Sequence, residues 1–223
     1  LHYTLDGSEP LANSPVYEAP VPVMQSLCLT GQLTSGGVAS PPFSIDVRRH
    51  AANGCAPALA FPYSGTYAGQ GPGSLTDGLL GDPDSLHGGW QGFVATDLDA
   101  IVDLGTAVML REVRGRFLQN ARSWVWLPSR LTVSASEDGR TYRAVGTVAN
   151  SLPLDRMESF AHEFSVEGDG QLARFVRVCA VNVGVCPPWH AGAGKDCWLF
   201  ADEIMINPME PATMATAADH GLK

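Results

Sequence analysis

The amino-acid sequence predicts an all-β protein. Glycine and proline are frequent, with 24 and 16 of the 223 residues, which is typical of many turns and short strands. Hydrophobic residues make up 45% and charged residues 17% of the chain, a balance that supports a packed core. Short apolar or alternating segments, separated by turn sequences, recur at the spacing of a β-sandwich.

Residues 1–50 predict a small β module. Leu1–Leu5 alternates, Val21–Leu29 is apolar, and Phe43–Val47 follows a Gly36-Gly37 turn. Three strands are too few for independent stability.

Residues 51–73 are rich in Ala, Pro and Gly and predict a linker that leads into a first edge strand. Residues 74–207 predict a β-sandwich, and residues 208–223 a disordered tail. The sandwich has seven strand candidates: Leu98–Leu104, Val108–Phe117, Arg130–Ser136, Tyr142–Val148, Glu158–Val166, Ala173–Val181 and Trp198–Ile206.

The net charge of −9 argues against a nucleic-acid partner and against an anionic membrane surface, because both require clustered Lys and Arg. No apolar run reaches the roughly 18 residues of a membrane span. The chain opens on Leu1 without a signal peptide or an initiating Met, so we expect it to be part of a longer protein.

The stretch from Trp189 to Ile204 combines a glycine-rich loop with a predicted closing strand. The loop carries aromatic residues, a histidine and a lysine, and therefore offers a surface for a ligand. Glu203 lies among apolar residues of the strand and must find a partner, because an unpaired carboxylate is costly to bury.

The five cysteines have no Cys-x-x-Cys spacing, so we expect no structural zinc site. Cys186 and Cys197 bracket the glycine-rich loop. They are either a disulfide, which a secreted setting would favour, or two buried thiols.

The run Tyr3 to Pro10, Tyr-Thr-Leu-Asp-Gly-Ser-Glu-Pro, followed by Ser14-Pro15-Val16-Tyr17, resembles a known module. It is similar to the small immunoglobulin-like module after the catalytic barrel of chitobiases and β-N-acetylhexosaminidases. The opening strands of that module are absent here, so the resemblance implies a truncated immunoglobulin-like unit in residues 1–50.

The second domain resembles the coagulation-factor type C, or discoidin-like, jelly-roll β-sandwich, whose bacterial members include family 32 carbohydrate-binding modules. The matching landmarks are Leu75–Gly78, Trp90–Phe93, Ile101–Gly105, Ser134–Gly139 and Ala201–Ile204. More narrowly, Gly89–Phe93, Phe117–Gln119 with Ser123-Trp124, and the Trp189–Gly194 loop resemble the version attached to family 20 glycoside hydrolases.

This resemblance implies a structural calcium ion, because such an ion is common in the family and calcium takes several oxygen ligands. The implied ligands are the side chains of Asp77 and Glu203, the backbone carbonyls of Leu75 and Asp202, and the hydroxyl of Ser85. The loop from Leu79 to Gly89 contains Ser85 and is longer than the family pattern. The position of Ser85 therefore has no direct match in that pattern. The alternative is that Asp77 caps a turn and Glu203 pairs with an arginine.

Sugar recognition needs an aromatic face and a few hydrogen-bonding groups. Candidates gather in three loops, and His190, Trp189, Gln119 and Asn120 rank above Trp124, Lys195 and His87. Trp90, Trp126 and Trp198 are weighed beside them, with Trp90 and Trp198 favoured as core. A histidine that binds its own loop remains the alternative for His190.

Asp202-Glu203 has the residue types of the catalytic pair of family 20 hydrolases, but that pair requires a barrel strand end. No barrel-length βα alternation, Gly-x-Ser-x-Gly elbow or His-Glu-x-x-His motif is present. We therefore expect no catalysis on this chain.

The sequence predicts a non-catalytic, glycan-binding accessory part of a secreted, periplasmic or cell-surface bacterial enzyme resembling β-N-acetylhexosaminidases. Its partners would be a glycan and the upstream catalytic domain of the same polypeptide. Two alternatives stay open, a structural module that packs on the catalytic barrel and an adhesion domain that binds protein. Exposure of Trp189 and Trp124 would favour sugar binding.

Overall fold

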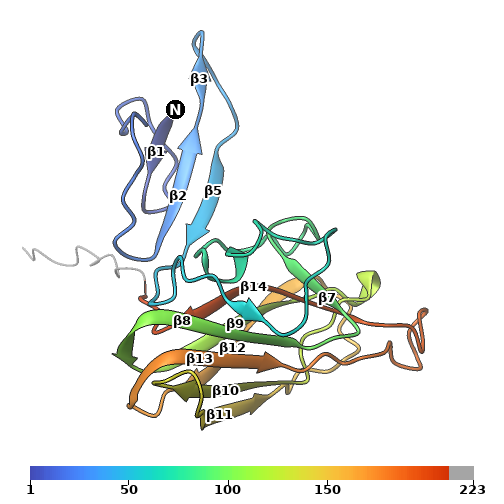
Figure 1. The fold of residues 1–223 in the computed structure, drawn as a ribbon. Coiled ribbons are helices and arrows are strands. Elements are labelled where there is room, and N and C mark those ends of the chain that lie inside the picture. The colour runs from blue at the N-terminus through green and yellow to red at the C-terminus, as the bar shows by residue number, and fades with distance from the viewer. Residues whose placement is uncertain (211–223) are drawn as a thin grey trace, which may run out of the picture. The chain divides into compact units, whose positions relative to one another are not determined.

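The computed structural model describes residues 1–210, and the predicted tail lies largely outside this range. The chain divides into two compact units (Figure 1). The smaller unit contains Leu1–Arg49 together with Met209 and Glu210, and the larger unit contains His50–Pro208. Among residues 1–210, no helix has the length and apolar character needed to cross a membrane.

The smaller unit is built on a three-stranded antiparallel sheet in the order β1-β2-β5, with a separate β3-β4 hairpin. Its strands are β1 (His2–Thr4), β2 (Leu27–Gln32), β3 (Thr34–Ser35), β4 (Val38–Ala39) and β5 (Phe43–Val47). β2 begins later than predicted because Pro20 and Pro22 lack the N–H groups that a ladder requires. The immunoglobulin-like assignment of this unit stays a prediction.

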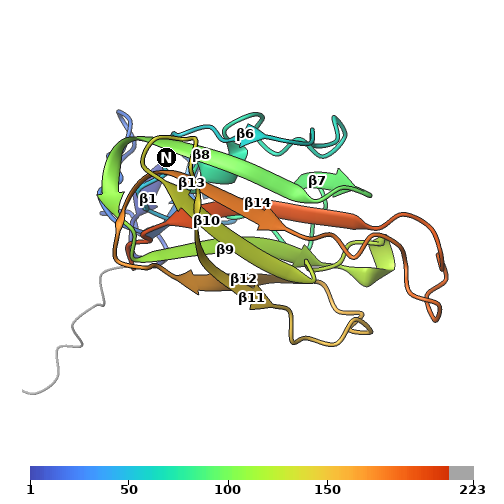
Figure 2. The same ribbon diagram turned by 60° about the horizontal axis from the view of Figure 1, so that its bottom comes forward.

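The larger unit is a two-layer β-sandwich (Figure 2). Its five-stranded sheet, in the order β11-β10-β13-β8-β6, contains β6 (Ala58–Leu59), β8 (Leu98–Met109), β10 (Arg130–Ser136), β11 (Arg143–Ala149) and β13 (Leu172–Ala180). Its four-stranded sheet, in the order β12-β9-β14-β7, contains β7 (Gln91–Val94), β9 (Glu112–Gln119), β12 (Phe160–Glu167) and β14 (Trp198–Ile206). Two short 3₁₀ helices, η1 (Ser74–Thr76) and η2 (Ala121–Ser123), lie in the loops.

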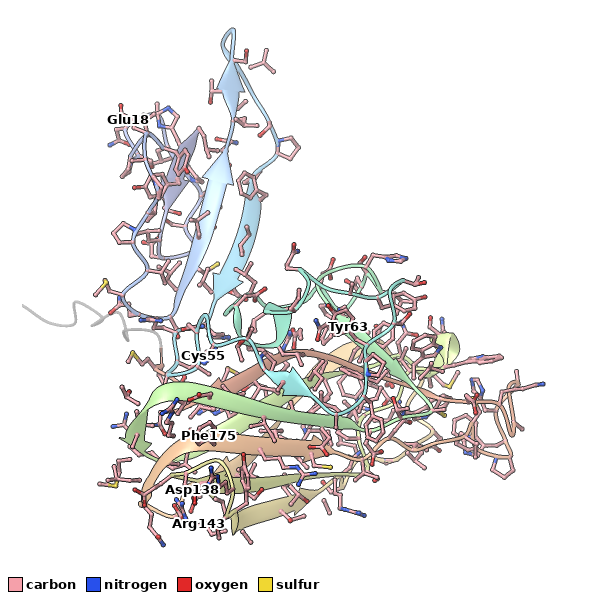
Figure 3. All side chains as sticks on the ribbon, in the orientation of Figure 1. Glu18, Cys55, Tyr63, Asp138, Arg143 and Phe175 are labelled. Carbon is pink, nitrogen blue, oxygen red and sulfur yellow. The ribbon has the colours of Figure 1, made fainter. Side chains whose placement is uncertain are left out.

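From β7 to β14 the chain crosses between the sheets at every step except the β10–β11 hairpin, which is the pattern of a jelly roll. The core lies between the two sheets and is filled by alternate residues of strands such as β8, with Leu98, Ala100 and Val102. Asp138, labelled in Figure 3, caps the turn of that hairpin. Its Oδ1 accepts hydrogen bonds from the backbone N–H groups of Arg140 and Thr141. The predicted all-β class with a β-sandwich is confirmed.

Two details of the larger unit differ from the expected elements. β8 runs on past Leu104 to Met109, because Gly105 adopts a φ of 74° and lets the strand bend without ending. Residues 51–73, predicted as a linker leading into an edge strand, lie within the larger unit, where Ala58–Leu59 forms the edge strand β6. β7 begins directly after Trp90, which was expected to head an apolar strand segment.

A β-bulge in β14 decides where the acidic pair lies. The register between β14 and β9 shifts between Ala201 and Glu203. Before the bulge Leu199 and Ala201 face the core, whereas after it Ile204 and Ile206 do. The extra residue therefore brings Asp202 and Glu203 side by side on the face of β14 that points away from the core.

Candidate functional site

A cavity of about 460 Å³ lies at one end of the sandwich. Three loops form it: the η2 loop after β9, the loop between β11 and β12, and the loop between β13 and β14. Figures 1 and 2 both show these loops at the same end. The lining residues are Arg122, Trp124, Asp155, Met157, Trp189, His190 and Ala191.

His190 is 8% exposed and stands at the centre of an aromatic group. The rings of Trp126, Trp189 and Trp124 contact it edge to face, with centroid distances of 5.0, 5.7 and 6.4 Å. His190 Nδ1 accepts a hydrogen bond of 3.1 Å from the backbone N–H of Gly192. In the neutral ring the proton is therefore on Nε2, which is available as a donor. His190 thus binds its own loop and also lines the cavity.

Trp124 and Trp189 supply the aromatic walls of the cavity, with 37% and 50% of their surfaces exposed. Trp124 has a φ of 66°, and its carbonyl accepts a hydrogen bond of 2.8 Å from the N–H of Trp198. A Cβ at Gly192 would lie 2.8 Å from the Trp124 ring, so glycine is required for this close approach. The two loops that carry the tryptophans are therefore packed directly on each other.

Sequence reasoning missed three lining residues, Arg122, Asp155 and Met157. Arg122 and Asp155 add a cationic donor and an anionic acceptor to the mainly apolar wall. Apolar ring faces beside a few donors and acceptors can bind a pyranose, which has one apolar side and several hydroxyl groups. No local motif marks the three residues, because they become neighbours only through the fold.

Gln119 and Asn120, predicted as ligand residues, lie behind the cavity wall. Gln119 is buried, and its side chain donates to the Arg156 carbonyl and accepts from the Leu127 N–H, both at 3.0 Å. Asn120 Nδ2 donates to Ser159 Oγ at 3.2 Å, and its Oδ1 caps η2. These contacts tie the η2 loop to the β11–β12 loop, so both residues position the wall.

The remaining candidates for sugar binding do not line the cavity, although the Trp126 ring contacts His190. Lys195 is exposed and closes its loop through backbone hydrogen bonds. His87 is exposed and stacks on Tyr67 at a centroid distance of 5.1 Å, beside Trp198 and Phe200. Trp90 and Trp126 are 1% exposed and belong to apolar clusters.

The side chains of Asp202 and Glu203 are fully buried. Asp202 Oδ2 pairs with Arg116 and accepts a 2.6 Å hydrogen bond from the Gly81 N–H, while its Oδ1 is buried without a hydrogen-bond partner. Glu203 Oε1 lies 2.9 Å from His50 Nε2, and Oε2 accepts from the Gly78 N–H at 2.9 Å.

Burial raises the pKa values of this cluster. It raises the pKa of Asp202 to about 7, against the opposing effect of Arg116. The pKa of Glu203 lies well above its usual value, first through burial and then through the charges of Asp77 and Asp202. Asp77 is half-buried, and burial raises its pKa as well.

Two observations favour a cation here: the charges of Asp77 and Asp202 help to raise the pKa of Glu203, and Asp202 Oδ1 has no hydrogen-bond partner. Leu75 is buried in η1, and Ser85 lies in a turn closed on Asp82 and Gly88. However, His50 and Gly78 occupy both Glu203 oxygens, and Asp77 Oδ1 accepts from the Leu79 N–H. Within residues 1–210, no three His, Cys, Asp or Glu side chains are grouped as metal ligands. An ion at Glu203 would have to replace the His50 contact.

Comparison with known proteins adds a short sequence match and several similar folds. A family model described as "Fn3 associated" matches residues 1–29. No curated protein sequence matches the chain.

Among solved structures, SpGH29 is 14% identical over 73% of this chain, with a TM-score of 0.45; the chain covers only 28% of SpGH29. The C-terminal domain of a chitobiase from Bacteroides fragilis is 11% identical over 73% of this chain and 97% of its own length, with a TM-score of 0.42. CpGH89CBM32-5 from Clostridium perfringens, in complex with GalNAc-β-1,3-galactose, is 12% identical over 73% of this chain and 100% of its own length, with a TM-score of 0.45. At these values the similarities assign neither a family nor a ligand to this chain.

Proposed function

We propose that the larger unit is a non-catalytic carbohydrate-binding module whose site is the cavity of Trp124, Trp189 and His190. The observation that carries this proposal is the convergence of two half-exposed tryptophans, an oriented imidazole and two charged side chains in one cavity. Exposure of both tryptophans favours a ligand surface over core packing.

The chemistry of the wall suits a single pyranose ring. Trp124 and Trp189 would contact its apolar face, His190 Nε2 would donate to a hydroxyl group, and Arg122 and Asp155 would bind further hydroxyls. The resemblance in sequence to accessory modules of family 20 hydrolases makes N-acetylglucosamine, N-acetylgalactosamine and galactose the sugars to test first.

In this account the module belongs to a bacterial, β-N-acetylhexosaminidase-like enzyme that works in the periplasm, at the cell surface or outside the cell. Weak sugar contacts become useful there because tethering raises the local concentration of the glycan around the catalytic domain. The parent enzyme and its location rest on the sequence resemblance alone.

We also propose that a structural calcium ion is held near Asp77 and Glu203, with Asp202 and Leu75 contributing carbonyl oxygens and Ser85 a hydroxyl. The clustered carboxylates support it. When bound, the ion would supply positive charge that lets these carboxylates stay ionised inside the protein.

The direct test of sugar binding is a calorimetric titration of the full chain with the three sugars. We expect saturable binding that Trp189→Ala or Trp124→Ala weakens about tenfold or more. Phe61→Ala is the matched control, because Phe61 is a 44% exposed aromatic residue outside the cavity. Equal affinity in all four proteins would place the site elsewhere, and no saturation would favour a structural or protein-binding module.

A further inference from the structure

Cys186 and Cys197 lie in contact at the base of the loop that carries Trp189 and His190. Their Sγ atoms are 3.8 Å apart, and the residues are 2% and 0% exposed. Backbone hydrogen bonds hold both residues, from the Cys186 N–H to the Lys195 carbonyl at 2.7 Å and from the Cys197 N–H to the Gly184 carbonyl at 2.9 Å. The two sulfur atoms are therefore fixed side by side.

We propose that Cys186 and Cys197 are a site of intrachain disulfide formation that closes the Trp189–His190 loop at its base. A disulfide bond is about 2.05 Å long, so the sulfurs need to approach by only about 1.8 Å. Cys28 belongs to the smaller unit, and Cys55 and Cys179 are partly exposed. All five cysteines are thiols in the structure, and among residues 1–210 only Cys186 and Cys197 bring their sulfur atoms into contact with each other as a cysteine pair.

The reaction requires an oxidant, and we name a small-molecule disulfide such as oxidised glutathione. The thiolate of one cysteine attacks the glutathione disulfide, forms a mixed disulfide and releases one glutathione thiol. The second cysteine then attacks the mixed disulfide and releases the other. One protein S–S bond replaces two S–H bonds, and two electrons and two protons pass to glutathione.

Burial raises the pKa of Cys197 to about 12, with the neighbouring Cys186 as the next cause. The thiolate form of Cys197 is therefore scarce in the folded protein at neutral pH. We expect the bond to form during folding, when the loop is open, and then to resist reductants as long as the protein stays folded.

The bond would act on the cavity through the loop. The loop contains the Trp189 wall and the His190 donor, and a link at its base removes conformations in which both leave the cavity. Its effect on sugar affinity rests on the proposed function, whereas the formation of the bond does not.

The test refolds the full chain in oxidised and reduced glutathione, blocks free thiols and digests the protein with trypsin. Trypsin cuts at Lys195, between the two cysteines, so a bond joins two peptides that dithiothreitol separates. We expect this linked pair in the wild type and in Cys179→Ser, and its loss in Cys186→Ser and in Cys197→Ser. Alkylation of both cysteines in the refolded wild type would overturn the proposal, and so would a linked pair that persists in Cys186→Ser.

A second readout tests the closure without a sugar. Amide hydrogen exchange across residues 187–195 should be about tenfold slower in the oxidised protein than in the reduced one. Equal exchange would overturn the role of the bond in fixing the loop. Slower exchange in the oxidised protein, together with no binding of any of the sugars, would contradict the proposed function but support the disulfide site.

Discussion

The imidazole of His190 connects the walls of the cavity. Its ring contacts three tryptophans, and its Nδ1 is held by the Gly192 N–H, so ring orientation and tautomer depend on the loop backbone. A residue that only stabilised its loop would not need to line a cavity as well. Gly192, whose N–H holds His190 Nδ1, is the position where a small substitution can test this arrangement.

Gly192→Ala should weaken sugar binding about tenfold with only a small loss of stability. The added Cβ would lie 2.8 Å from the Trp124 ring and 3.3 Å from His190 Nδ1, so both groups must shift. Calorimetry against the sugar that binds the wild type measures the effect. Gly65→Ala is the control, since Gly65 has open space around its Cβ position and no positive φ. Unchanged affinity in Gly192→Ala would argue against the Trp124–His190 wall as the site.

The buried carboxylates predict an unusual pH dependence in calcium-free buffer. The folded pKa of Asp202, about 7, lies above the unfolded value of about 3.9, so the native state binds more protons between these pH values. Stability from this group is complete below pH ~4 and is lost as the pH rises through ~7. The raised pKa of Glu203 acts in the same direction.

Thermal unfolding at pH 5.5 and 7.5 should therefore give a midpoint about 5 °C or more lower at pH 7.5. Glu203→Gln, which removes one of the charges, should flatten this dependence, whereas Glu137→Gln at an exposed turn should not. Identical slopes in wild type and Glu203→Gln would show that Glu203 is ionised throughout and compensated by His50 and its other neighbours.

At the scale of elements, regular strands were predictable and their irregularities were not. The predicted Arg130–Ser136 and Trp198–Ile206 strands have the bounds observed, because long apolar periods report burial directly. The β14 bulge is defined only by the register between β14 and β9. The local sequence therefore does not predict that Asp202 and Glu203 lie on the same face of the strand.

The same limit applies to the site. A glycine-rich loop with Trp189 and His190 is visible in the sequence, and so is Trp124 after a strand. Arg122 and Asp155 come from separate loops, and only the tertiary fold brings them to the cavity. Gln119 was singled out as a hydrogen-bonding residue of the loop that carries Trp124, yet its amide binds two backbone groups.

Gln119→Leu should lower the thermal midpoint by about 5 °C or more, because it leaves the buried Leu127 N–H without its acceptor and removes the donor to Arg156. It should also weaken sugar binding, since the β11–β12 loop loses a tether to the η2 loop. Gln171→Leu at an exposed position is the control. A midpoint equal to that of the control would contradict the positioning role.

At the scale of the whole molecule, the proposed calcium ion would couple the first loop of the sandwich to its last strand. An ion that binds only the folded state stabilises it by about 2.7 kcal/mol at one hundred times its dissociation constant. Removing calcium with a chelator at pH 7.5 should then lower the unfolding midpoint by about 5 to 10 °C. Added calcium should also abolish the pH dependence described above.

Asp77→Asn separates the effect of the ion from the stability of the fold. Asparagine has nearly the same shape as aspartate but lacks the negative charge of the proposed ligand. Its midpoint should respond less to calcium than that of the wild type. A midpoint that the chelator leaves unchanged would show that His50 and Arg116 alone compensate the carboxylates.

The proposed function of the larger unit depends most on where a sugar binds. The chain has five tryptophans, and their indole N–H signals in nuclear magnetic resonance spectra can be assigned one by one with single substitutions. On titration with N-acetylglucosamine, N-acetylgalactosamine or galactose, we predict saturable shifts of the Trp124 and Trp189 signals, while the buried Trp90 signal stays in place. Saturable shifts confined to Trp198, or no shift with any of the three sugars in a folded protein, would contradict a sugar site in this cavity.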